Sequence, residues 1–94
     1  MLAGAHGAVH RRTALHTWPA VFQTGSRFVV SLCWIDGVLY IGCEDPPAVY
    51  ITRDLVSADK RTGWSGRGPA YVCEYQGVPV VSRWENGKAI IELL

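Results

Sequence analysis

The chain has 94 residues, of which 49% are hydrophobic and 18% are charged, and its formal net charge is +1. This length fits one domain, and the hydrophobic content excludes an intrinsically disordered chain. The near-neutral charge provides no overall field that would attract nucleic acid or an anionic membrane, so neither is an expected partner.

Residues 1–17 are the first segment, in which three histidines and two arginines interrupt the apolar residues. They leave no apolar run as long as the core of a signal peptide. The segment is therefore predicted to be a flexible amino terminus, and residues 18–94 to form a single globular domain. His6 and His10 have the spacing of two metal ligands on a helix face, but no third ligand has recognisable spacing. We expect no metal, and because no phosphate- or dinucleotide-binding pattern is present, no cofactor either.

The chain has three cysteines, Cys33, Cys43 and Cys73, and none of them form a Cys-x-x-Cys pair. A small secreted scaffold held by disulfides has more cysteines, in an even number. The thiols are therefore predicted to be reduced and the protein to be cytoplasmic. No stretch approaches the roughly 18 consecutive apolar residues of a membrane helix, so a membrane is not an expected partner.

Three dipeptides mark tight turns between β-type runs: Asp36-Gly37, Gln76-Gly77 and Asn86-Gly87. Asp-Gly and Asn-Gly favour two-residue hairpin turns, because both central residues of such a turn need a positive φ. The turns predict an antiparallel hairpin over 27–43 and a three-stranded meander over 70–93.

The segment between the hairpin and the meander has apolar residues at the spacing of a helix face. These residues are Ala48, Ile51, Leu55 and Ala58. Acidic residues and two prolines come first, two basic residues end the run and a glycine follows, which is the usual order for a helix. A helix is therefore predicted near 47–61. A short strand at 49–52 is the alternative, because that run is β-type.

These elements predict an α+β fold, in which one helix covers a face of a strongly twisted antiparallel sheet of five or six strands. A short β-type run at 20–23 could pair with the strand that follows it. The alternative is an all-β, SH3-like, partly open barrel without the helix.

The connection over 60–69 is the most distinctive stretch, because it combines three glycines with basic and aromatic side chains. Its candidate binding residues are Lys60, Arg61, Trp64 and Arg67. A tryptophan ringed by positive charge suits an acidic protein patch or a phosphate-bearing ligand, and Trp and Arg are enriched at interface hot spots. The alternative is a flexible connection whose Trp64 packs onto the sheet.

Apolar residues occur on both faces of the predicted hairpin and meander, while one helix can cover only one face. In the meander, one face consists of alternate residues of each strand, the first of which is Tyr71 and the last Leu93. The other face mixes apolar residues with charged ones. The apolar positions on the second faces are Val29, Ile35, Val38 and Tyr40 on the hairpin, and Val72, Val81, Ile90 and Leu94 on the meander. Large exposed apolar patches mark interaction surfaces, so we expect a homo-oligomer, with a dimer as the first choice.

No pair of titratable residues is placed for acid–base catalysis, and each cysteine falls in an apolar β-type run, where nothing activates the thiol. We therefore expect a non-enzymatic binding or interaction module that acts as a homo-oligomer and recognises its partner through the loop over 60–69. The alternative is a small enzyme or small-ligand-binding protein whose site lies at the oligomer interface.

Overall fold

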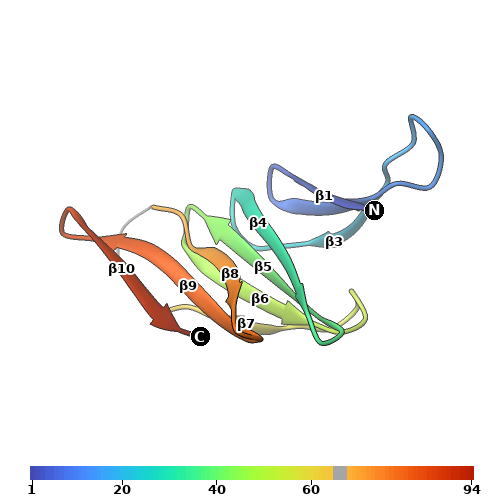
Figure 1. The fold of residues 1–94 in the computed structure, drawn as a ribbon. Coiled ribbons are helices and arrows are strands. Elements are labelled where there is room, and N and C mark those ends of the chain that lie inside the picture. Colours follow the sequence, from blue (N-terminus) through green and yellow to red (C-terminus); the bar gives the residue numbers. More distant parts are fainter. Residues whose placement is uncertain (65–67) are drawn as a thin grey trace.

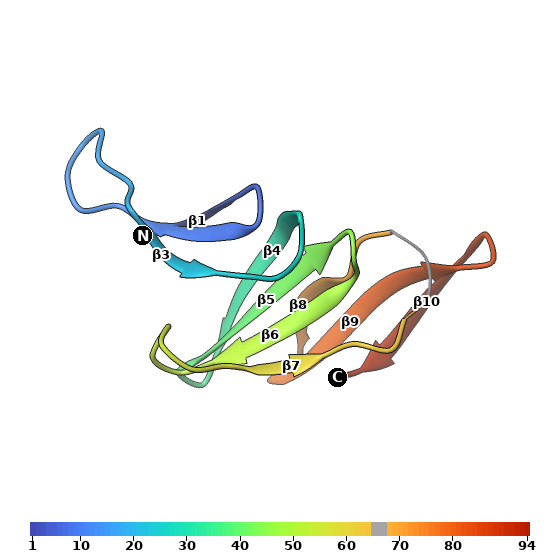
Figure 2. The same cartoon turned by 180° about the vertical axis from the view of Figure 1, so that it is seen from behind.

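The computed structural model describes residues 1–64 and 68–94, and its strands form three antiparallel sheets (Figure 1). The first sheet consists of β1 (Leu2–Ala5), β2 (Ala8–Arg11) and β3 (Ala20–Gln23). The second consists of β4 (Phe28–Ile35), β5 (Val38–Glu44), β6 (Ala48–Thr52) and β7 (Asp59–Arg61). The third consists of β8 (Tyr71–Tyr75), β9 (Val78–Glu85) and β10 (Lys88–Leu93), with β9 in the middle. Seen from both sides, the four-stranded sheet lies between the other two (Figures 1 and 2).

Two hydrophobic cores lie on the two faces of the four-stranded sheet. The first core joins Val9 of β2 to Leu39, Ile41 and Cys43 of β5, all of which are fully buried. The second core lies against the third sheet and consists of Val49, Ala70, Val72 and Val81. The segment predicted to be a flexible amino terminus thus supplies β1 and β2, and Val9 packs in the first core.

None of the described residues is helical, so the predicted α+β fold with one helix near 47–61 is wrong. The all-β alternative fits, and its strands are arranged as three stacked sheets. The segment that was expected to be helical contains β6 and β7, and β6 coincides with the alternative strand at 49–52.

The position of β6 between two layers explains why its sequence resembles a helix. Ala48 and Tyr50 belong to the first core, whereas Val49 belongs to the second. Leu55, in the loop that follows, has a φ of 61° and places its side chain back in the first core. Apolar residues therefore recur at the spacing of a helix face, although the chain is extended.

The three predicted turns are confirmed, and with them the hairpin and the meander. Asp36, Gln76 and Asn86 have φ values of 50°, 52° and 51°, and the glycine after each also has a positive φ. The ladders continue without interruption on both sides of the turns at 76–77 and 86–87.

Close packing at Gly42 of β5 brings the chain segment before β8 onto the four-stranded sheet. A Cβ atom at position 42 would overlap the carbonyl oxygen of Ala70 and the hydroxyl of Ser31. The Ser31 hydroxyl accepts a hydrogen bond of 3.0 Å from the backbone N–H of Val72. These contacts hold the third sheet against the second, with one of its faces turned inward.

Candidate interaction site

Lys60 and Arg61 are adjacent in the sequence, but strand β7 directs their side chains to opposite faces of the sheet. The Nζ atom of Lys60 lies 5.5 Å from the centre of the Tyr50 ring, on the side of the first core. Arg61 pairs with Val49, and because successive side chains of a strand alternate, it lies on the opposite face. Arg67 lies outside the described residues. The structure therefore does not bring Lys60 and Arg61 together on one face.

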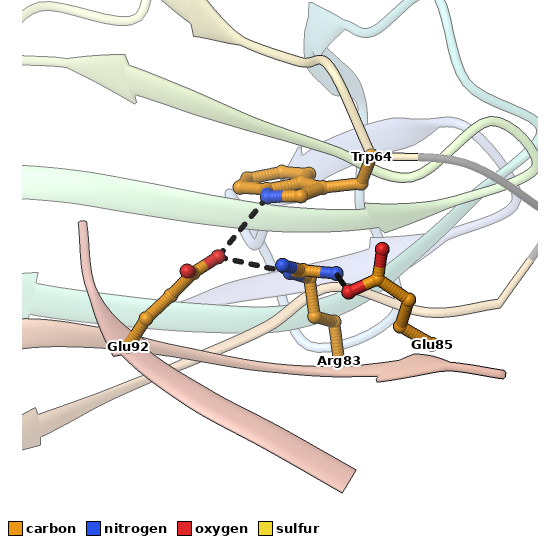
Figure 3. Close-up of polar contacts among 4 residues, drawn as sticks. All are labelled: Trp64, Arg83, Glu85 and Glu92. Carbon is orange, nitrogen blue, oxygen red and sulfur yellow. Dashed lines mark hydrogen bonds and ion pairs between the residues drawn. The ribbon is translucent and has the colours of Figure 1, made fainter. Parts of the chain in front are cut away.

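Trp64 lies against the third sheet, with its ring half-buried beside the second core. The indole Nε1 donates a hydrogen bond of 3.2 Å to Oε1 of Glu92 on β10 (Figure 3). This position corresponds to the alternative in which the tryptophan packs onto the sheet.

An ionic cluster on the inward face of the third sheet holds the partner of Trp64 in place. Arg83 of β9 donates to Glu92 at 2.9 Å and to Glu85 at 3.2 Å (Figure 3). The Arg83 side chain is only 14% exposed, so the cluster is partly shielded from water. The hydrogen bond from Arg83 lowers the pKa of the Glu92 carboxyl, and the bond from Trp64 acts in the same direction. The cluster therefore has a structural role: it fixes the chain that follows β7 to the third sheet.

The opposite face of the third sheet, which we call the outer face, points away from both cores. Its large apolar side chains are exposed: Ile91 by 72%, Leu93 by 73% and Trp84 by 57%. None of the side chains on this face carries a charge. By strand register, the outer face consists of Tyr71, Cys73, Tyr75, Val78, Val80, Ser82, Trp84, Ala89, Ile91 and Leu93.

The sequence identifies the residues on both faces of the meander but does not indicate which face lacks cover. In the structure Val72 and Val81 are 5% and 0% exposed because they pack in the second core. The charged residues on their face are accommodated by pairing, as Arg83 and Glu92 show. The other face contains no charged residue, and this feature of the sequence could have identified it as the exposed face.

The remaining candidate features of the described residues include two cysteines with perturbed thiols and a groove. Burial raises the pKa of the thiols of Cys33 and Cys43, which opposes a role as nucleophile. A groove of about 400 Å³ lies beside Tyr40 and Ile51 of the middle sheet, and none of its lining residues belongs to the outer face. Within residues 1–64 and 68–94, no three His, Cys, Asp or Glu side chains are grouped as metal ligands. The same residues include no helix that could cross a membrane.

No protein-family model, curated protein or solved structure matches this chain.

Proposed function

We propose that the protein is a non-enzymatic interaction module that forms a homodimer through the outer face of the third sheet. One observation carries the proposal: a face made from three strands is uncharged and exposed to solvent. Soluble monomers rarely expose contiguous apolar patches of more than a few hundred Å², and larger ones mark interaction sites.

The area of the outer face supports a second copy as the occupant. Its six largest exposed side chains are between 42% and 73% exposed. For side chains of these sizes, that exposure corresponds to roughly 800 Å², which is the usual share of one partner in a standard interface. A single additional copy would therefore be enough to cover the face.

The chemistry of the outer face points to the same occupant. A charged partner surface would lose its hydration against this face without gaining an opposite charge. A second copy of the face carries no charge and loses little polar hydration. Aromatic side chains such as Tyr71 and Trp84 bury large areas at low cost in conformational entropy.

Two other expectations belong to this proposal. Lys60, Arg61 and Arg67 stay predicted contacts for an acidic protein or a phosphate-bearing ligand, but the separation of Lys60 from Arg61 favours the outer face as the main contact surface. A cytoplasmic location is supported by the cysteines, all three of which are free.

The proposal is tested by measuring the mass in solution by light scattering at high micromolar concentration. We expect the wild type at twice the mass of the chain and Ile91→Lys at the monomer mass, because the new charge would be buried in the interface. Val56→Lys is the matched control, since Val56 is 83% exposed and lies in the loop between β6 and β7. It should leave the dimer intact. A wild type that stays monomeric, or a dimer that survives Ile91→Lys, would overturn the proposal.

A further inference from the structure

Resting on the proposed function, we infer that the dimer is closed and symmetric, with its two-fold axis passing close to Ser82 of β9. The inference concerns which residue meets its own copy across the interface. It follows from the register of the third sheet and from the symmetry of a face that binds itself.

Ser82 and Val80 occupy the centre of the outer face. Ser82 pairs with Tyr71 on β8 and with Ile91 on β10, whereas Val80 pairs with Cys73 and Leu93 in the next row. Each central residue therefore has a neighbour on both sides. One further row of the outer face lies beyond each of them along β9.

The centre of the face is also its least exposed part. Val80 is only 7% exposed, while Ile91 and Leu93 beside it on β10 are more than 70% exposed. Tyr71, on the other side, is 46% exposed. In the row of Ser82, the small serine side chain lies between the larger Tyr71 on β8 and Ile91 on β10. A partner that covers the whole face surrounds this centre on all sides, so Ser82 becomes one of the most enclosed positions in the dimer.

Symmetry then determines what Ser82 meets. Two copies that bind through the same patch form an isologous interface, which is related by a two-fold axis. If each face covers the whole of the other, the centre of one face lies over the centre of the other. The Ser82 side chains of the two copies then face each other across the interface, in sheets that pack about 10 Å apart.

The competing arrangement joins the two copies at a strand edge. β10 is an edge strand of its sheet, and a second β10 could extend the ladder. In that arrangement three strand spacings, about 14 Å in total, separate the two β9 strands, and both Ser82 side chains point to the same side of the combined sheet. Ser82 would then not meet its own copy.

A charge-swap experiment distinguishes these arrangements. We expect Ser82→Asp and Ser82→Lys, each alone, to weaken self-association roughly 100-fold, because two like charges meet in an enclosed interface. An equal mixture of the two variants should form a heterodimer, which native mass spectrometry identifies by its mass. The matched controls, Val56→Asp and Val56→Lys, should each dimerise alone as the wild type does. Far-ultraviolet circular dichroism checks that every variant is folded.

Modification of Cys73 in the wild type gives a test without substitutions. Cys73 is exposed in the single chain and is adjacent to Val80 on the outer face. Its reaction with a maleimide should slow at least tenfold at concentrations where the dimer is saturated, and recover on dilution. Unchanged reactivity of Cys73 in a proven dimer would overturn the inference, because the face would then be open.

The outcomes separate the inference from the proposed function. If Ile91→Lys is monomeric but the mixture of Ser82→Asp and Ser82→Lys forms no heterodimer, the outer face is the interface and the two-fold centre at Ser82 is wrong. If the wild type is monomeric, both are wrong.

Discussion

Replacing Trp64 by alanine tests whether this side chain is a structural plug or an exposed anchor. Complete truncation of a buried tryptophan costs about 3–5 kcal/mol. Trp64 is half-buried. Its replacement by alanine removes the contacts with the second core and the hydrogen bond to Glu92. We therefore expect a loss of about 2 kcal/mol in the free energy of unfolding. In a domain of this size that loss lowers the Tm by roughly 10 °C.

The assay is thermal unfolding followed by circular dichroism, at a fixed protein concentration so that association contributes equally. Trp34→Ala is the matched control, because the Trp34 side chain is 53% exposed and its removal should cost less than about 1 kcal/mol. Trp64→Phe should fall between wild type and Trp64→Ala, since it keeps most of the packing but loses the Nε1 donor. If the Tm of Trp64→Ala lies within about 2 °C of the wild-type value, the packing of Trp64 against the third sheet is refuted. The loop over 60–69 is then favoured again as the recognition surface.

Three further substitutions or treatments have definite expected results. Gly42→Ala should destabilise the protein by about 1–3 kcal/mol in denaturant unfolding, because its Cβ has no room against the segment before β8; an unchanged midpoint would contradict the close packing there. Because the pKa of Glu92 is lowered in the folded state, its ion pair stabilises the fold above the pKa of the unfolded chain and is lost as the pH falls through the lower, folded value. The Tm of the wild type should therefore fall more between pH 6 and pH 3 than that of Glu92→Gln, and equal slopes would show that this carboxylate does not contribute. In the dilute monomer a thiol reagent should modify exposed Cys73 quickly and buried Cys43 only after denaturation; equal rates would show that the first core is open.

The turns were predictable because their cause is local. Asp36-Gly37 and Asn86-Gly87 can adopt the positive φ values that a two-residue hairpin requires, and this preference does not depend on the rest of the fold. Once the turns are placed, the antiparallel pairing of the flanking strands follows. The hairpin and the meander were therefore predicted with their partners.

The strand β6 was not predicted as the first choice, because its environment is not local. A strand with one face in water alternates between apolar and polar residues, but β6 has a core on each face. Ala48, Val49 and Tyr50 are consecutive and all buried, so the period of two disappears. The prolines before the run and the basic residues after it then imitate the ends of a helix.

The choice between the two faces of the meander depended on information outside the meander. Both faces carry apolar residues, and the sequence does not show which of them meets the four-stranded sheet. The structure shows that charged residues can lie on the inward face when they pair, as Arg83 does with Glu85 and Glu92. The uncharged face is therefore the exposed one, and it is a larger candidate contact surface than the loop over 60–69. The positive charge expected around Trp64 includes Lys60 and Arg61, and the alternation of β7 places these two side chains on opposite faces.

The order of the three sheets along the chain has a consequence for how the protein is made. Residues 2–23 supply the first sheet, 28–61 the second and 71–93 the third, so each layer is one uninterrupted piece of chain. A ribosome therefore releases the layers in the order in which they stack, and no strand must wait for a partner from a distant layer to complete its ladder. Until the last third of the chain emerges, Val49 and its neighbours on that side of the middle sheet face water. This intermediate exposes an apolar β-surface, and the interval before the third sheet arrives is when a nascent chain is most open to capture by chaperones.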